Sequence, residues 1–317
     1  MTPLIRIEHQ DPRKGQILFV DWLLGNLCNY SCSYCPSTLH DGSIAWSPYE
    51  QVVGFGEYLV RHCEALGKTA FVQFTGGEIT LYRDLRKVAA HLQAIGCRIG
   101  LISNGSRGLD TWRALREVTD MVVFTYHLEF SPLPRFIEVV RLMSERVRTH
   151  VNIAMLPDRF QECAQAATAI SESCTDITLT LKPLLVDFGE QLYDYTAEQR
   201  TTMADPQYPP KLTRPLNGIR GDMRCHFADG TEQVLSATQL LVQGLNRWSG
   251  WICNAGLEIL SVDAQGYVYR GVCREGGAIA HISDALPALP SQPVRCTRVT
   301  CHCLSDIMTS RRASAET

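Results

Sequence analysis

The sequence has 317 residues, of which 45% are hydrophobic and 20% charged, and these proportions exclude a largely disordered chain. Its 30 Lys and Arg residues against 33 Asp and Glu give a formal net charge of −3, which disfavours a non-specific nucleic-acid binder. No apolar run reaches the ~18 residues that span a bilayer, and residues 1–16 are too polar for a signal peptide. We therefore expect a cytoplasmic protein that does not associate with a membrane.

Short apolar runs alternate with amphipathic stretches from residue 17 to about residue 185. The runs are Ile17–Leu24, Ala70–Phe74, Ile99–Ile102, Met121–Tyr126, Val151–Leu156 and Ile177–Leu181. Their β-branched and aromatic residues are typical of parallel strands that are buried on both faces. The repeated strand–helix units predict an α/β fold with right-handed crossovers. A closed eight-fold barrel takes about 250 residues, so six units over residues 17–186 predict an open, partial (β/α)6 barrel.

Helix signals lie between these runs, and the first of them is the most complete. Ser47-Pro48-Tyr49-Glu50 matches a capping box with proline at the first helical position. Gly67 follows the last apolar position and predicts the end of that helix. In a sheet of this kind the functional site is expected at the carboxyl ends of the strands.

The pattern changes after residue 186. Residues 187–222 contain several prolines and tyrosines without a sustained period, which predicts a linker or an excursion facing the substrate. Two β-hairpins are then predicted within residues 223–317, which form a small C-terminal domain, and residues 1–16 are expected to be an N-terminal extension. The hairpins pair Met223–Phe227 with Thr231–Leu235, and Leu257–Val262 with Tyr267–Val272.

Thirteen cysteines without an export signal indicate a reducing compartment, in which thiols serve metal binding or catalysis. Three of them, Cys28, Cys32 and Cys35, lie in one short segment directly after the first predicted strand. A closed structural zinc site requires four ligands. Three cysteines without a nearby fourth are instead typical of a [4Fe–4S] cluster that has one open iron.

Two further motifs follow the next two predicted strands, namely Gly76-Gly77-Glu78 and Ser103-Asn104-Gly105. Together with the three cysteines they resemble, over roughly residues 17–185, the radical S-adenosylmethionine (SAM) superfamily. The resemblance implies a SAM-binding [4Fe–4S] cluster on the cysteines and reductive cleavage of SAM to a 5′-deoxyadenosyl radical. That radical would abstract hydrogen from an unactivated C–H bond, and a low-potential electron donor such as flavodoxin or ferredoxin would supply the electron.

The resemblance also implies a set of SAM-binding residues. They are Tyr34, Gly76, Gly77, Glu78, Ser103, Asn104, His127 and Lys182. Glu78 would pair with the SAM ammonium, and Tyr34 would offer an aromatic face and a backbone edge to the adenine. Many relatives carry Ser-x-Asp where this sequence has His127-Leu128-Glu129, so His127 is either a SAM or substrate contact or a polar strand end. Lys182 is either a carboxylate ligand or a solvated lysine.

A second group of five cysteines lies near the C-terminus. Its members are Cys253, Cys273, Cys296, Cys301 and Cys303. They resemble the SPASM and twitch extensions of radical SAM enzymes, and this implies an auxiliary [4Fe–4S] cluster with one thiol to spare among Cys296, Cys301 and Cys303. Four thiolates also suit zinc, so a structural zinc site remains the alternative.

The expected substrate is a peptide or a small natural-product precursor that undergoes oxidation, crosslinking or epimerisation. The alternative is a nucleotide or nucleic acid, although the acidic charge balance weighs against the latter. A non-enzymatic metal-binding module would leave the Gly76-Gly77-Glu78 and Ser103-Asn104 motifs unexplained.

Overall fold

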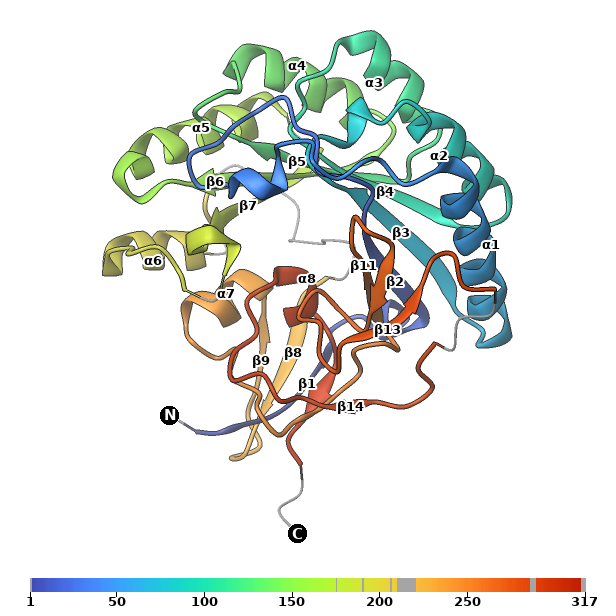
Figure 1. Ribbon diagram of the computed structural model, residues 1–317. Helices are drawn as coiled ribbons and strands as arrows, with labels where there is room; N and C mark the ends of the chain where they lie inside the picture. Colours follow the sequence, from blue (N-terminus) through green and yellow to red (C-terminus); the bar gives the residue numbers. More distant parts are fainter. Residues whose placement is uncertain are drawn as a thin grey trace.

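Two β-sheets organise the computed structural model, which describes residues 2–174, 176–189, 191–205, 207–209, 221–285 and 289–314 (Figure 1). The larger sheet has nine strands. In order across the sheet they are β13 (Ala278–His281), β12 (Tyr267–Tyr269), β11 (Ile259–Val262), β2 (Ile17–Leu23), β3 (Thr69–Thr75), β4 (Arg98–Ser103), β5 (Met121–Tyr126), β6 (Arg148–Met155) and β7 (Ile177–Pro183). Strands β2–β7 are parallel and confirm the six predicted strands.

Five helices connect these parallel strands and cover the outer face of the sheet (Figure 1). They are α1 (Tyr49–Ala65), α2 (Leu85–Ala94), α3 (Leu109–Arg116), α4 (Leu133–Ser144) and α5 (Phe160–Ser173). The alternation of strand and helix confirms the predicted α/β class with a parallel sheet. The inner face of the sheet turns toward the C-terminal elements, which lie below it in Figure 1.

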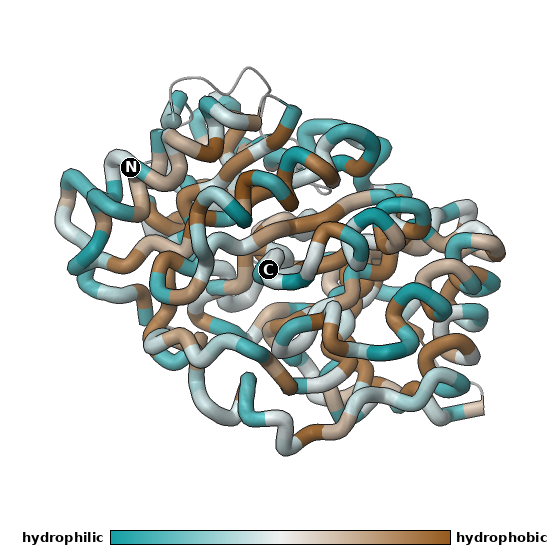
Figure 2. The backbone as a smooth tube through the Cα atoms, turned by 90° about the horizontal axis from the view of Figure 1, so that it is seen from above, coloured by the Kyte–Doolittle hydropathy of each residue, from teal (hydrophilic) through white to brown (hydrophobic). Residues whose placement is uncertain are grey.

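The main hydrophobic core lies between the sheet and its helices. Trp22 of β2 is fully buried, and its ring centroid lies 5.4 Å from that of Phe55 in α1 and 5.7 Å from that of Phe74 in β3. Burying one such side chain stabilises the fold by about 1.5–3 kcal/mol. Figure 2 shows hydrophobic residues along the strands and hydrophilic residues on the outer turns, as this packing requires.

The start of α1 differs from the predicted capping box. Its N-cap is Pro48, and no side chain caps the helix. The backbone N–H of Ser47 donates to the Leu24 carbonyl oxygen at 2.7 Å, so Ser47 is fixed to the end of β2 rather than to the helix. The predicted end of the helix is confirmed, because Gly67 follows it with a φ of +64° that favours glycine.

The smaller sheet brings distant parts of the sequence together. In order across the sheet its strands are β14 (Val294–Arg295), β10 (Ile252–Cys253), β15 (Arg311–Arg312), β1 (Leu4–His9), β8 (Met223–Phe227) and β9 (Glu232–Leu235). The hairpin of β8 and β9 is confirmed. Strand β1 pairs antiparallel with both β15 and β8, so the residues predicted as an N-terminal extension form an interior strand of this sheet.

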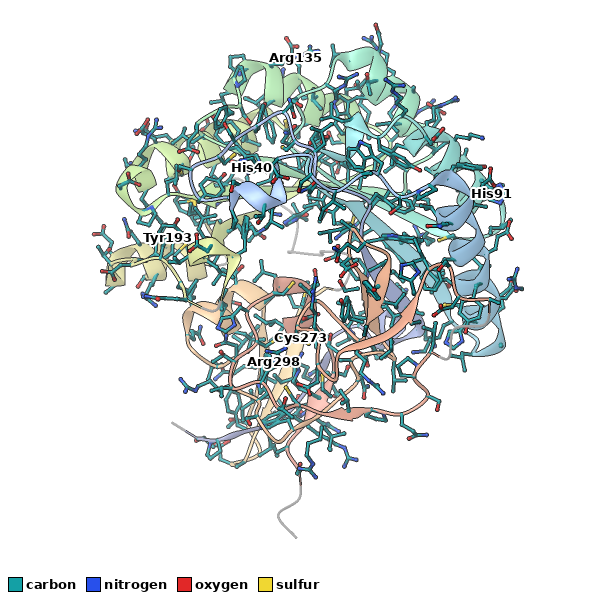
Figure 3. All side chains as sticks on the ribbon, in the orientation of Figure 1. His40, His91, Arg135, Tyr193, Cys273 and Arg298 are labelled. Carbon is teal, nitrogen blue, oxygen red and sulfur yellow. The ribbon has the colours of Figure 1, made fainter. Side chains whose placement is uncertain are left out.

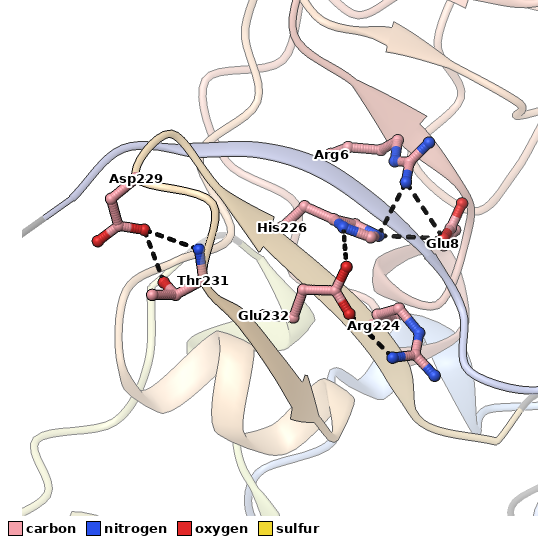
Figure 4. Close-up of polar contacts among 7 residues, drawn as sticks. All are labelled: Arg6, Glu8, Arg224, His226, Asp229, Thr231 and Glu232. Carbon is pink, nitrogen blue, oxygen red and sulfur yellow. Dashed lines mark hydrogen bonds and ion pairs between the residues drawn. The ribbon is translucent and has the colours of Figure 1, made fainter.

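Charged side chains reinforce the contact between β1 and the β8–β9 hairpin (Figure 4). The His226 ring lies between two carboxylates, with Nε2 3.0 Å from Glu8 Oε1 and Nδ1 2.9 Å from Glu232 Oε1. Arg224 Nη1 reaches Glu232 Oε2 at 3.0 Å. At the hairpin turn, Asp229 Oδ1 accepts hydrogen bonds from the Thr231 backbone and hydroxyl. These contacts hold the N-terminal strand against the hairpin.

The second predicted hairpin is confirmed as β11 and β12. It was expected within the small C-terminal domain, but it extends the larger sheet. Strand β11 pairs parallel with β2, and β12 pairs antiparallel with β11. All four residues of β11 are buried, so this strand needs cover on both faces, and the edge of the larger sheet supplies it.

The segment predicted as a linker contains a regular helix. α6 (Ala197–Ala204) begins with a capping box formed by Thr196 and Gln199. Residues 210–220 of that segment lie outside the described residues. Two short helices, α7 (Ala237–Val242) and α8 (Leu304–Ile307), complete the fold. None of the helices in the described ranges is long and apolar enough to cross a membrane.

Candidate active site

The loop after β2 carries Cys28, Cys32 and Cys35 at the carboxyl end of the sheet. The Cys35 N–H donates to the Cys32 carbonyl oxygen at 2.9 Å and closes a turn between these cysteines. The Tyr30 N–H donates to Cys28 Sγ at 3.4 Å, and Asn104 Nδ2 approaches the same sulfur at 3.9 Å. Donors directed at sulfur favour a thiolate, which is the form in which cysteine binds iron.

Burial shapes the titration of these three thiols. It raises the pKa of Cys28, that of Cys32 to about 12 and that of Cys35 to about 11. Free thiols with such pKa values keep their protons at neutral pH. Metal binding at this loop therefore releases protons, and it should strengthen as the pH rises.

Two side chains from the loop after β5, those of His127 and Glu129, contact the cysteine loop. His127 Nδ1 lies 2.5 Å from the Tyr34 hydroxyl and 3.4 Å from Cys32 Sγ. Glu129 Oε2 accepts a hydrogen bond from the Ser33 N–H at 2.8 Å. Burial, with a smaller contribution from Lys182, lowers the pKa of His127 to about 4, so the ring is neutral at neutral pH. His127 and Tyr34, both predicted to bind SAM, contact each other here.

The loop after β3 packs directly on the backbone that leads into the cysteine loop. The Gly77 N–H donates to the Gly25 carbonyl oxygen at 3.2 Å, and the Glu78 N–H donates to that of Leu27 at 2.8 Å. A Cβ on Gly77 would lie 2.3 Å from the Leu27 backbone, and one on Gly76 would lie 2.6 Å from the Gly25 oxygen. Both positions therefore require glycine because two backbones approach each other closely.

Glu78 is fully buried and saturated with protein donors. Its Oε1 accepts hydrogen bonds from the Thr80 N–H at 3.0 Å, the Thr80 hydroxyl at 2.5 Å and the Ser103 hydroxyl at 2.7 Å. Its Oε2 accepts one from the Asn104 N–H at 2.8 Å. Burial raises the pKa of Glu78, and these four hydrogen bonds oppose that rise. Glu78 thus organises the ends of β3 and β4.

Two residues of this network escaped the sequence analysis. Thr80 supplies two of the four donors to Glu78, and Asn29 Oδ1 accepts from Asn104 Nδ2 at 3.0 Å. Through Asn104 the carboxylate network is joined to the cysteine loop. Only their positions next to the motifs could have indicated these two residues in the sequence, since Asn29 follows Cys28 and Thr80 lies two positions after Glu78.

The sequence and the fold agree with one family. Residues 22–168 match the family profile described as the Radical SAM superfamily. The chain therefore contains a radical SAM domain over these residues. No curated protein matches the sequence.

Solved structures show the same fold at low sequence identity. SuiB of Streptococcus suis superposes with a TM-score of 0.54 and 10% identity, over 85% of this chain and 64% of SuiB. SuiB bound to its precursor peptide SuiA gives a TM-score of 0.55 with 11% identity, over 85% of this chain and 63% of that one. The anSMEcpe structure with bound AdoMet gives 0.55 with 14% identity, over 84% and 78%. The chain thus covers less than two thirds of the length of SuiB.

A cavity of about 520 Å³ separates the inner face of the radical SAM sheet from the C-terminal region. Its polar wall on the sheet comes from alternate strand positions, namely Asp21, Gln73, His150, Asn152, Thr180 and Lys182. Phe19, Ile102, Met121 and Val123 add apolar surface. Of the predicted SAM-binding residues only Lys182 lines this cavity; Glu78 and its hydrogen-bond partners do not.

The C-terminal cysteines line two adjoining cavities, and Cys273 and Cys301 line both of them. Four of them line a second, small cavity of about 20 Å³; they are Cys253, Cys273, Cys296 and Cys301. Cys303 lines the larger cavity but not the small one. Burial, followed by the nearby Asp306 carboxylate, raises the pKa of the Cys303 thiol to about 12. Figure 3 marks Cys273 and Arg298, which lie in the C-terminal region and line both cavities.

A buried arginine adjoins the small cavity. Arg311 is 4% exposed, and its guanidinium lies 3.8 Å from the centre of the Trp248 ring. It donates to backbone oxygens, including that of Thr309 at 2.9 Å. Burial alone would lower the pKa of Arg311, but the nearby Cys253 and Cys301 raise it above its ordinary value, with a smaller contribution from Asp306.

Proposed function

We propose that this radical SAM enzyme abstracts a hydrogen atom from a peptide or small natural-product precursor held in the larger cavity, and that an auxiliary Fe–S cluster assists the reaction. In this proposal strands β2–β7 form a partial barrel of the radical SAM type. The C-terminal region corresponds to a SPASM or twitch-like domain. One observation carries the proposal: the cavity on the inner face of the sheet and the cavity lined by four cysteines share a wall.

The first cluster is assigned to Cys28, Cys32 and Cys35. Hydrogen-bonding groups approach the Cys28 and Cys32 sulfurs, and His127 and Glu129 fix the loop that carries all three cysteines, so this loop is suited to a cluster. When bound, the cluster and SAM supply the 5′-deoxyadenosyl radical. The protein's own part is to keep the ends of β3 and β4 in place beside the cysteine loop, which the hydrogen bonds of Glu78 accomplish.

The auxiliary site is assigned to Cys253, Cys273, Cys296 and Cys301. A buried cation is costly unless anions compensate it. Among the described residues no ion pair includes Arg311, and the groups that raise its pKa most are Cys253 and Cys301. Metal-bound thiolates would supply the missing negative charge. This argument supports a metal centre at the four cysteines and leaves Cys303 outside the ligand set.

Iron–sulfur and zinc are the two candidates for that centre. The small cavity is about the size of one water molecule. Nowhere in the described ranges do three His, Cys, Asp or Glu side chains converge closely enough to hold a metal ion, so the four thiols would have to turn toward a common centre to bind either group. The wall shared with the substrate cavity favours a redox-active cluster, because an electron acceptor is useful only close to the substrate.

Lys182 is the proposed contact for an anionic group of the substrate. It lies near the carboxyl end of β7 and lines the larger cavity, and among the described residues it has no ion-pair partner. Burial lowers the pKa of its ammonium, whereas Cys303 and Asp21 raise it. A volume of about 520 Å³ is in the range of small-ligand sites, about 300–1,000 Å³. The precursor peptide in the SuiB complex supports a peptide segment as the occupant.

The test combines metal analysis with product analysis on anaerobically reconstituted protein. We expect about eight irons per chain, two [4Fe–4S] clusters, and release of 5′-deoxyadenosine when SAM and a reductant are added. Changing Cys28, Cys32 and Cys35 to Ala together should remove one cluster and all SAM cleavage. Changing Cys253 and Cys273 to Ala should remove the other cluster and leave cleavage intact. Four irons and one zinc in the wild type would replace the auxiliary cluster by a structural zinc site.

A further inference from the structure

Cys32 lies in a triangle of hydrogen-bonding side chains that no part of the proposed reaction requires. His127 Nδ1 is 3.4 Å from Cys32 Sγ and 2.5 Å from the Tyr34 oxygen. The Tyr34 hydroxyl also hydrogen-bonds the Cys32 sulfur. The Tyr34 and His127 rings are almost parallel, with 9° between their planes and 6.1 Å between their centroids. The three polar groups are therefore held in fixed positions by ring packing.

The direction of each hydrogen bond follows from the chemistry of Cys32. A cysteine that ligates iron carries no proton, so its sulfur can only accept. The Tyr34 O–H then donates to the sulfur. The Tyr34 oxygen accepts in turn from His127 Nδ1–H, which also lies within reach of the sulfur. A neutral imidazole has one ring N–H, and these contacts put it on Nδ1.

The neighbouring contacts keep this triangle in place and distinguish Cys32 from Cys35. The Tyr30 ring lies edge-on to His127 at 6.0 Å and stacks on Phe130 at 5.3 Å. Cys35 Sγ approaches the Pro36 carbonyl oxygen at 3.8 Å, which is an acceptor and not a donor. In the described structure, two side-chain donors with ring support thus meet at one sulfur of the loop.

We propose that Tyr34 and His127 are positioning residues that donate hydrogen bonds to the Cys32 thiolate and raise the reduction potential of the cluster bound by Cys28, Cys32 and Cys35. The inference rests on the ligand set proposed above. A reduced cluster carries one more negative charge than an oxidised one. Hydrogen bonds to a ligating sulfur therefore stabilise the reduced form more, and reduction becomes easier.

The test is a redox titration of the full-length, reconstituted protein. It measures the reduction potential of the cluster whose electron paramagnetic resonance signal changes when SAM is added. Tyr34→Phe removes one oxygen and keeps the buried ring. His127→Leu removes the ring donor, whereas His127→Asn keeps an amide N–H near the position of Nδ1. The matched control is Tyr30→Phe, which loses a hydroxyl from the same loop while its ring still packs on Phe130.

We expect Tyr34→Phe and His127→Leu to shift the potential of the SAM-responsive cluster to more negative values. His127→Asn and Tyr30→Phe should stay at the wild-type potential. In the double variant Tyr34→Phe/His127→Leu, the potential should shift by less than the sum of the two single shifts, because His127 acts partly through Tyr34.

Tyr34→Phe with full iron content and the wild-type potential would overturn the inference, whatever the His127 variants do. An equal shift in Tyr30→Phe would overturn it as well. Failure of Tyr34→Phe to hold the first cluster would also count against it, because the hydroxyl would then serve assembly and not potential. A wild-type protein without a SAM-responsive cluster would instead refute the proposed function.

Discussion

His9 Nε2 and Glu258 Oε2 lie 3.2 Å apart in the protein interior, although 249 positions separate the two residues in the sequence. His9 ends β1 of the smaller sheet, and Glu258 directly precedes β11 of the larger sheet. The Glu258 carboxylate also accepts hydrogen bonds from Asn254 Nδ2 at 2.7 Å and from the Ser310 N–H at 2.9 Å. One buried carboxylate therefore joins the two sheets.

Acid should weaken this junction. Burial alone would raise the pKa of Glu258, but the hydrogen bonds from His9 and Asn254 outweigh it and lower the pKa to about 2. An unfolded glutamate titrates near pH 4.3, so the stabilisation is complete above that pH and is lost as the pH falls toward 2. We expect the thermal unfolding temperature of the wild type to fall over this range more steeply than that of Glu258→Gln. Glu64→Gln, on an exposed position of α1, should keep the wild-type slope. Parallel slopes for the wild type and Glu258→Gln would contradict the assignment.

Glu78→Gln should destabilise the metal-free protein. A carboxamide cannot accept from all four donors around Glu78, and an unsatisfied buried donor costs about 1–3 kcal/mol of unfolding free energy. Denaturant unfolding without iron or SAM measures this loss, and Ser103→Ala should give a smaller one because it removes a single donor. A residue whose role was limited to the SAM ammonium would leave the stability of the metal-free protein unchanged.

Gly77→Ala should separate the β3 loop from the cysteine loop. The added Cβ would lie 2.3 Å from the Leu27 backbone, and backbone cannot rotate away as a side chain can. We expect a loss of about 1–3 kcal/mol of unfolding free energy, together with weaker cluster binding at Cys28, Cys32 and Cys35. Gly54→Ala is the matched control, since it meets no atom within 4 Å inside α1 and should be neutral or stabilising. Equal behaviour of the two variants would show that the close approach is unimportant.

Cys301→Ala and Cys303→Ala should differ in iron content. Cys301 lines both cavities and shares the small one with three other cysteines, whereas Cys303 lines only the larger one. We expect Cys301→Ala to lower the iron content toward that of one cluster and Cys303→Ala to retain the wild-type value. Iron analysis of the two reconstituted proteins, side by side, measures this. The reverse result would exchange their roles.

Much of the larger sheet could be predicted because its information is local. Runs such as Met121–Tyr126 are apolar throughout, and strands buried on both faces need that composition. The Gly76-Gly77-Glu78 motif was recognised through its resemblance to the radical SAM family, and the structure supplies a physical reason for it, since two backbones approach each other closely at the glycines.

The remaining features depend on contacts between distant residues. Ser47 has the sequence of an N-cap, but its backbone is bound to Leu24. The pairing of β11 with β2 could not be deduced from the hairpin sequence, because the hairpin signal is the same at a sheet edge as in a separate domain. The division of Cys301 from Cys303 depends on which way each side chain points, and spacing carries no such information.

The position of β1 between β15 and β8 has a consequence for the order in which the protein folds. Strand β1 is synthesised first, yet one of its neighbours, Arg311–Arg312, is synthesised after the entire larger sheet. Strands β2–β7 pair with neighbours close in sequence and can form on the ribosome. The smaller sheet must wait, and until translation reaches β15 one edge of β1 stays open to other chains.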